Sequence, residues 1–203
     1  MNIAFTSIGN RPHTVYMILR LRETMPNANL IQISDFDTPK HEGVDVCIRT
    51  EYNEELSLFI LKAFTIVPYS ECLFVGDDTI FQKDVSHLLD DDYEVLICTR
   101  PIMGDGVNKN YHINMPYNSG FVITKNPIFW KDCYDLAKTY DKKYRVWLGD
   151  QMAINDIIKS GKYKLKEVDG RYYNAVPKKK NNNGLAYVFH YKGDRKEWLY
   201  GYM

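Results

Sequence analysis

The sequence has no net charge, few cysteines and no long apolar segment. Its 26 Lys and Arg residues match its 26 Asp and Glu residues in number, so the overall charge indicates no polyanionic partner. No apolar run approaches the length that crosses a bilayer, and the first residues have the pattern of a strand rather than of a signal peptide. We therefore expect a cytoplasmic protein without a membrane span.

The cysteine pattern argues against a zinc site and against disulfides. The four cysteines are widely spaced, and the sequence contains no CxxC motif and no Cys/His ladder, which are the usual patterns of zinc ligands. Three of them, Cys47, Cys72 and Cys98, lie in apolar strand-like runs. We interpret the cysteines as buried thiols in a reducing compartment.

Length and composition suit one domain with a substantial core, since the chain has 203 residues and 45% of them are apolar. Charge is unevenly distributed within that domain. Residues 159–203 contain eleven basic and four acidic residues, whereas Asp84–Glu94 contains five acidic residues and no Lys or Arg. One end of the molecule is therefore a candidate anion-binding surface.

Strand-like and helix-like segments alternate along the chain without repeats. The predicted strands are Asn2–Thr6, Leu30–Ser34, Val44–Ile48, Cys72–Val75, Val95–Cys98, Tyr117–Thr124, Tyr163–Val168 and a last strand that ends at His190. Helices are expected to begin near Asn10, Asn53, Asn126 and Gly149. The first helix places Val15, Ile18 and Leu19 on one face, and a long polar connection covers residues 101–115. The alternation indicates a single α/β domain with a mainly parallel central sheet flanked by helices.

The segment that organises the chain lies in its middle. The apolar strand Cys72–Val75 leads through Gly76 into two neighbouring carboxylates, Asp77 and Asp78. A buried strand that ends there presents them at the carboxyl edge of the sheet, where open α/β sheets bind ligands. Adjacent carboxylates repel each other unless a cation or hydrogen-bond donors hold them, and such oxygen ligands suit Mg²⁺ or Mn²⁺. Gly-Asp-Asp is also ordinary turn chemistry, so a surface turn is the alternative.

Three further polar clusters lie at the ends of predicted strands or the starts of predicted helices. They are Asn118–Ser119, Gly149–Gln151 and His190–Lys196. Each alone has a structural explanation, since Asp150 can cap its helix and His190 can be a hydrogen-bonded core histidine. Function often resides in loops that rigid elements hold, and the clusters together indicate one site.

The order and spacing of these clusters resemble the retaining nucleotide-sugar glycosyltransferases of the glycogenin and galactosyltransferase type, called family 8, which have the GT-A fold. Tyr69–Thr79 is similar to that family's strand leading into Asp-x-Asp-Thr, and Asn118–Gly120 is similar to its Asn-(Ser/Ala)-Gly strand. Gly149–Gln151 is similar to its Gly-Asp-Gln helix start, and His190–Trp198 to its closing His-x-x-Gly-x-x-Lys-Pro-Trp. Before the first of these motifs the resemblance is thinner.

The resemblance implies a role for each matched residue. Asp78 and His190 would bind Mn²⁺ or Mg²⁺, with Asp77 as a further candidate ligand. The cation would bridge the diphosphate of a nucleoside-diphosphate sugar, and Gly193 and Lys196 would contact the phosphates. A cation and a lysine placed there stabilise the negative charge that grows on the leaving diphosphate.

The remaining implied roles concern the transferred sugar and the nucleotide. Asn118, Asp150 and Gln151 would face the donor sugar and the reacting centre. Thr6 and Asp35, which end the first two strands, would contact the nucleotide. The resemblance thus implies one nucleotide-diphospho-sugar transferase domain over residues 1–203.

The sequence departs from the family motif at Gly76, where the family has the first Asp. Asp77 cannot simply replace it, because adjacent side chains of an extended chain point to opposite sides, although a turn there would change this. Three outcomes are open: a weakened metal site, a rearranged site that uses Asp77, or a domain that binds without catalysis. Glu197 replaces the proline of the closing motif.

Two functions remain open. The first is a metal-dependent glycosyltransferase with a nucleoside-diphosphate donor, for which the resemblance implies uracil as the base and retention of configuration. The second is a non-catalytic module that binds nucleotide sugars or anions. The acceptor is open among glycans, proteins, small molecules and modified DNA, whose phosphates the basic loop at Lys178–Lys180 would hold. A solvated surface loop is the alternative.

Overall fold

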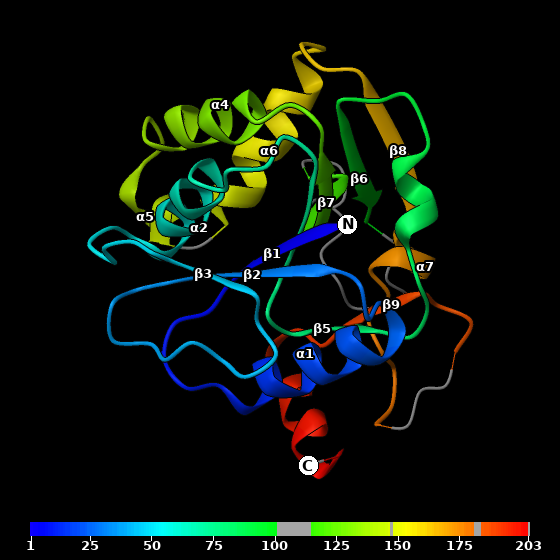
Figure 1. Ribbon diagram of the computed structural model, residues 1–203. Helices are drawn as coiled ribbons and strands as arrows, with labels where there is room; N and C mark the ends of the chain where they lie inside the picture. Colours follow the sequence, from blue (N-terminus) through cyan, green and yellow to red (C-terminus); the bar gives the residue numbers. More distant parts are fainter. Residues whose placement is uncertain (101–114, 147, 181–183, 203) are drawn as a thin grey trace.

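Seven strands form the central sheet of the computed structural model (Figure 1), which describes residues 1–100, 115–146, 148–180 and 184–202. They are β1 (Asn2–Thr6), β2 (Asn29–Ser34), β3 (Val46–Arg49), β4 (Cys72–Val75), β6 (Val95–Thr99), β7 (Tyr117–Thr124) and β8 (Leu165–Asp169). They lie in the order β3-β2-β1-β4-β7-β6-β8, and among these seven β7 alone runs antiparallel to its neighbours. The protein is an α/β domain with a mainly parallel sheet, as the sequence predicts.

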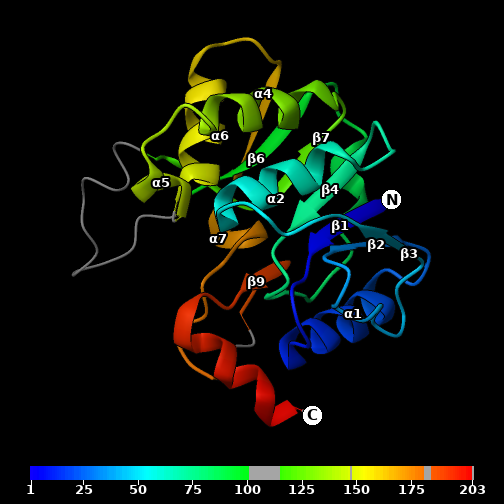
Figure 2. The same ribbon diagram turned by 90° about the vertical axis from the view of Figure 1, so that its left-hand side faces the viewer.

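Helices cover both faces of the sheet (Figures 1 and 2). One face carries α2 (Leu56–Thr65), α4 (Ile128–Ala137) and α6 (Gly149–Lys159), with the short α5 (Lys142–Val146) next to α2. The other face carries α1 (Pro12–Thr24). Successive side chains of a strand point to opposite faces, so Ala4 of β1 packs with the three helices, whereas Ile3 and Phe5 pack with α1.

A second sheet joins the middle of the chain to its end. β5 (Thr79–Phe81) pairs antiparallel with β9 (Val188–His190), and Thr79 lies opposite His190. This sheet packs into the same core as α1. The remaining elements are η1 (Ser86–Leu89), α7 (Gly170–Tyr173) and the 3₁₀ helix η2 (Gly193–Tyr202), which packs against α1 (Figure 2). The pairing of β5 with β9 brings the two most distant sequence motifs together.

The expected buried face of α1 is partly wrong. Ile18 is buried, but Val15 and Leu19 are 38% and 55% exposed. The helix instead buries the side that carries Met17 and Leu21. That side continues into the buried first-turn residues His13 and Thr14, which contact Asp77 just after β4.

None of the described helices is long and apolar enough to cross a membrane. The polar connection expected over residues 101–115 lies almost entirely outside the described residues. In the basic loop, Lys178, Lys179 and Lys180 are described and are exposed.

Candidate active site

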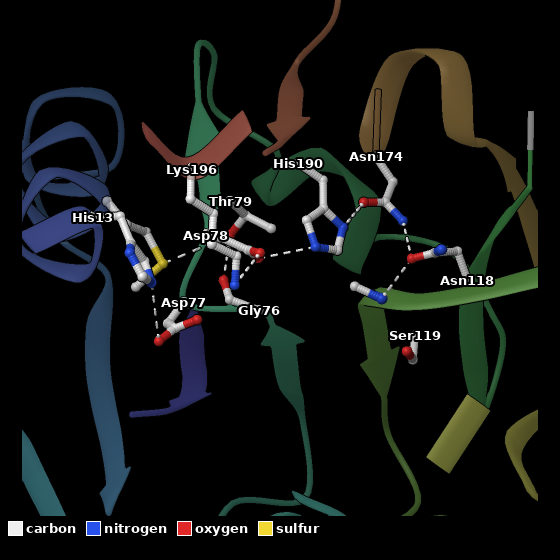
Figure 3. Close-up of polar contacts among 12 residues, drawn as sticks. His13, Gly76, Asp77, Asp78, Thr79, Asn118, Ser119, Asn174, His190 and Lys196 are labelled. Carbon is white, nitrogen blue, oxygen red and sulfur yellow. Dashed lines mark hydrogen bonds and ion pairs between the residues drawn. The ribbon is translucent and has the colours of Figure 1, made fainter. Parts of the chain in front are cut away.

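The chain turns sharply where β4 of the large sheet passes into β5 of the small sheet (Figure 3). The Thr79 backbone N–H donates to the Gly76 carbonyl at 3.2 Å, and the Thr79 hydroxyl donates to the same oxygen at 2.8 Å. Asp77 and Asp78 occupy the two central positions of this turn, and both are buried. The two carboxylates point in different directions from it.

Asp78 points toward the end of the chain. Its Oδ1 lies 2.9 Å from His190 Nε2, and its Oδ2 lies 2.9 Å from Lys196 Nζ (Figure 3). The opposition of Thr79 and His190 in the small sheet places the imidazole there. Burial acts to raise the pKa of the Asp78 carboxyl, but His190 and Lys196 outweigh burial and hold this pKa well below its usual range. Asp78 is therefore ionised at neutral pH.

A chain of hydrogen bonds orients His190. The Gly120 backbone N–H donates to Asn118 Oδ1 at 2.9 Å, and Asn174 Nδ2 donates to the same oxygen at 2.7 Å. Asn174 Oδ1 then faces His190 Nδ1 at 2.8 Å, and because a carbonyl oxygen only accepts, Nδ1 carries a proton. Burial, opposed in part by Asp78, lowers the pKa of His190 and so favours the neutral ring. Nε2 lies 2.9 Å from the ionised Asp78 carboxylate, so this contact needs a proton or a cation between the two atoms.

Gly120 leaves the space that His190 occupies. A β carbon built at position 120 would lie 2.2 Å from His190 Nδ1, so any larger residue would displace the imidazole. This is the physical reason for glycine in the Asn-Ser-Gly motif. Position 76 faces the same site, since a β carbon at Gly76 would lie 2.7 Å from Asp78 Oδ1 and 3.5 Å from His190 Nε2. A side chain at position 76 would therefore overlap Asp78 Oδ1, and a carboxylate there would enter the space between Asp78 and His190 only with a shift of Asp78.

Asp77 points the opposite way, toward α1. Its Oδ2 accepts a hydrogen bond from Arg11 Nη1 at 3.3 Å and lies 3.5 Å from His13 Nε2. Of the predicted ligand set, Asp78 and His190 meet, whereas Asp77 does not join them. Over the described ranges, no group of three or more His, Cys, Asp or Glu side chains is placed to hold a metal ion.

Asp150 lies in the first turn of α6, beside the start of β7. Ser57 Oγ donates to its Oδ1 at 3.2 Å, and Ser119 Oγ donates to its Oδ2 at 3.4 Å. Burial raises the pKa of the Asp150 carboxyl, and the hydrogen bonds offset this effect only in part. Asp150 thus differs from Asp78 in having hydroxyl partners instead of cations.

The start of α6 is tightly constrained. Leu148 has a φ of 74°, a left-handed conformation that costs about 1–2 kcal/mol in a residue other than glycine. A β carbon at Gly149 would lie 2.7 Å from the Tyr144 carbonyl oxygen, so glycine is required there. The first turn of α6 also places the buried Gln151, whose Nε2 donates to Met115 Sδ at 3.5 Å.

Two adjoining cavities open onto these residues. Both are lined by Leu56, Ile60, Asp78, Ser119, Asp150, His190 and Lys196. The first, which we call the β1-side cavity, extends to Thr6 and Arg11. The second, the β6-side cavity, extends to Arg100, Asn118, Gln151, Lys192 and Gly193. All predicted site residues except Asp35 therefore line one or both cavities. Asp35 lies in the loop after β2, where its Oδ1 accepts from the Thr38 backbone N–H at 2.8 Å.

Three residues of the site are missed by sequence reasoning. Asn174 lies in no motif, and it reaches the site only through the packing of α7 next to β9. Arg100 follows the end of β6 and donates to the carbonyls of Met115 and Tyr117 at 3.1 and 3.4 Å. Burial, together with the charge of Arg100, lowers the pKa of Lys192 to about 8. In the sequence, Arg100 could have been found only from its position after a strand, and Lys192 only from its position within the closing motif.

No protein-family model matches the chain, and no curated protein matches it. Solved structures match it in fold. The glycosyltransferase GlyE from Streptococcus pneumoniae TIGR4 superposes with a TM-score of 0.68 and 14% identity, over 98% of this chain and 59% of its own. The galactosyltransferase LgtC, solved with donor and acceptor sugar analogues, superposes with a TM-score of 0.65 and 13% identity, over 100% of this chain and 96% of its own.

The bifunctional glycosyltransferase WbbM superposes with a TM-score of 0.61 and 14% identity, over 96% of this chain and 46% of its own. This chain thus spans 59% of the length of GlyE and nearly all of LgtC. At these identities the likeness concerns the fold, and the chain has the GT-A fold of these glycosyltransferases.

Proposed function

We propose that the protein is a glycosyltransferase that moves a sugar from a nucleoside-diphosphate donor, with uridine as the nucleoside, to an acceptor with retention of configuration. One observation carries the proposal: Asp78, His190 and Lys196 meet in a cavity beside the carboxyl end of β4. Open α/β sheets bind nucleotides at this edge. The fold, which glycosyltransferases share, supports the same conclusion.

The residues present fit a divalent cation that also takes oxygens from the donor. Asp78 Oδ1 and His190 Nε2 lie 2.9 Å apart, which matches the roughly 3 Å between neighbouring ligands of an octahedral ion with bonds of about 2.1 Å. Asn174 fixes His190 with its Nε2 lone pair toward this point, as outer partners of metal-binding histidines do. We infer that Asp78 and His190 would hold Mn²⁺ or Mg²⁺, which when bound would stabilise charge on the leaving diphosphate.

The side chains around the cation site would divide the remaining tasks. Lys196 would neutralise a phosphate oxygen as negative charge grows on the diphosphate. Asn118 and Gln151 line the β6-side cavity, where their amides would hydrogen-bond the sugar hydroxyls. Asp150 would stabilise the positive charge that develops on the sugar ring, and a phosphate oxygen would take the acceptor proton.

Donor hydrolysis tests this proposal without knowledge of the acceptor, because transferases release some sugar to water. We expect at least one UDP-sugar to release UDP slowly, in a reaction that needs Mn²⁺ or Mg²⁺ and stops with EDTA. The measurement is UDP release from a panel of nucleotide sugars with each cation. The absence of UDP release with every donor and every cation would argue against a transferase.

Gly76 favours a second candidate, a module that binds nucleotide sugars without transferring them, since it supplies no carboxylate. The variant Gly76→Asp separates the two. With a small shift of Asp78, its side chain would enter the space beside Asp78 and His190. It would then tighten Mn²⁺ binding by about tenfold or more, if the added ligand matters as much as an outer-shell partner. Hydrolysis that appears only in Gly76→Asp supports the module. Hydrolysis by the wild-type protein supports the transferase.

A further inference from the structure

The β6-side cavity contains two cations that the proposed diphosphate contacts do not use. Arg100, just after β6, and Lys192, just after β9, line this cavity but not the β1-side cavity. Lys196 lines both cavities and is paired with Asp78 at 2.9 Å. The β6-side cavity has a volume of about 340 Å³, within the range of small-molecule sites.

Lys192 lies in this cavity, and the charge of Asp78 compensates the charge of its ammonium only in part. Within the part of the chain that the structure describes, no carboxylate lies at ion-pair distance from its ammonium, and Asp78 is engaged by His190 and Lys196. The other carboxylate of the cavity, Asp150, accepts from hydroxyl groups. The nearby Arg100 adds repulsion between like charges. Lys192 is only partly exposed, and charges withdrawn from water are normally paired, so the arrangement favours an anion from a ligand.

The place of these cations indicates which part of the substrates would bring that anion. Asp78, His190 and Lys196 lie where the two cavities meet, and the diphosphate belongs there under the proposed function. Lys192 lies on the side of Asn118 and Gln151, which the proposed function assigns to the sugar. The nucleoside would extend the other way, toward Thr6 in the β1-side cavity.

On the basis of the proposed function, we propose that Lys192 and Arg100 bind a carboxylate or phosphate group carried by the transferred sugar or by the acceptor. The planar guanidinium of Arg100 suits both groups, and the Lys192 ammonium supplies a point charge. The proposal thus predicts that, besides the diphosphate, either the transferred sugar or the acceptor carries a negative charge.

The experiment compares three proteins by isothermal titration calorimetry: the wild type, Lys192→Met and the control Lys179→Met. Methionine keeps most of the lysine stem without its charge, and the exposed Lys179 lies outside both cavities. Each protein is titrated with UDP, UDP-glucose and UDP-glucuronic acid in the presence of Mn²⁺. The UDP-saturated proteins are then titrated with inorganic phosphate and with free glucuronate.

If the sugar carries the anion, the wild type and Lys179→Met bind UDP-glucuronic acid about tenfold or more tightly than UDP-glucose, as expected for a hydrogen bond to a charged group. Lys192→Met then binds the two donors with similar affinity. If the acceptor carries it, the two donors bind alike, and the UDP complex binds phosphate or glucuronate unless Lys192 is replaced.

Two results overturn the inference while the proposed function stands. One is UDP binding with no selection of either anion. The other is an equal loss of affinity for UDP and both donors in Lys192→Met, which would place Lys192 on the diphosphate. Failure of every nucleotide to bind would overturn both proposals.

Discussion

Asp77 and Asp78 are neighbours in sequence and are both buried, yet they belong to two different clusters. Asp77 lies against the first turn of α1, where Arg11 and Thr14 donate to its Oδ2 at 3.3 Å. Asp78 lies against β9 and η2, between His190 and Lys196. The turn between β4 and β5 separates two carboxylates that repulsion alone would drive apart. One anchors a helix, and the other belongs to the candidate active site.

Removal of each carboxylate in turn gives the largest expected contrast. We expect Asp78→Ala and His190→Ala to lower donor hydrolysis by about 100-fold or more, the usual loss for a group that stabilises developing charge, while both variants still fold with reduced stability. Asp77→Ala should keep most of the hydrolysis but lose stability by about 1–3 kcal/mol, because it leaves buried donors without their acceptor. Hydrolysis rates and chemical unfolding curves of the three variants are the measurements.

Equal losses of hydrolysis in well-folded Asp77→Ala and Asp78→Ala would break this contrast. Both carboxylates would then act at the reacting centre. Normal hydrolysis in both Asp78→Ala and His190→Ala would instead remove the cation assignment.

Gly120→Ala tests whether the position of the imidazole, rather than its presence, matters in the Asp78 cluster. The added β carbon would overlap the ring of His190, so we expect a loss of hydrolysis nearly as large as that of His190→Ala. Gly161→Ala is the control, since Gly161 has a φ of 70° and open space around it. That variant should lose stability without losing hydrolysis. Unchanged hydrolysis in Gly120→Ala would show that the ring can move without consequence.

The sequence predicts the Asp78 cluster better than the Asp77 cluster. The sequence shows polar residues at the end of β4 and in the closing motif, both at strand ends. The fold that these motifs imply brings the two groups of residues together. The direction of Asp77 depends on a turn of four residues and on the rotation of α1. Met17, Ile18 and Leu21 do have helical spacing, but that spacing does not show that the same side of α1 carries the polar His13 and Thr14 to a distant strand end.

Asn174 shows the same limit within the candidate active site. It is far from His190 and Asn118 in sequence and lies in no motif, yet it bonds to both. Its place depends on how α7 packs against β6, β8 and β9. Local patterns predict which residues end elements, whereas tertiary packing decides which of them touch.

Asn174→Leu should disturb the Asp78 cluster less than loss of His190 does. The variant removes the acceptor of the Nδ1 proton, so the imidazole should populate both tautomers. Loss of such an outer partner typically costs about 10–100-fold in metal affinity or activity. The ¹⁵N chemical shifts of the His190 ring, measured at a pH where the ring is neutral, report the tautomer directly. The buried His41, which contacts Ser7, is the internal control. A His190 ring that keeps its Nδ1 proton in the variant would contradict the assigned role.

Asp150 extends the comparison to a half-buried carboxylate that has hydroxyl partners and no cation. Its pKa is raised by burial, so the folded state binds the proton more tightly than the unfolded state does. Its ionisation therefore removes stability as pH rises from the usual carboxyl pKa through the raised one. The variant Asp150→Asn carries an uncharged amide at every pH, so it should be more stable than the wild type at neutral pH. Its advantage should shrink as pH falls toward the usual pKa of an aspartate.

Thermal unfolding of the wild type and Asp150→Asn between pH 4 and pH 7 measures this small effect, since 1 kcal/mol shifts the melting temperature of a chain of this size by about 2–4 °C.

Asp84→Asn is a control of opposite sign, because a hydrogen bond from the Ser86 backbone lowers the pKa of Asp84. The ionised Asp84 adds stability that is fully present above the usual carboxyl pKa and is lost as pH falls from there through the lowered pKa, so the scans of this control continue below pH 4. If Asp150→Asn gains stability and loses hydrolysis, the Asp150 charge serves catalysis and lowers the stability of the folded state. A wild type more stable than Asp150→Asn at neutral pH would mean that this carboxylate is compensated like Asp78.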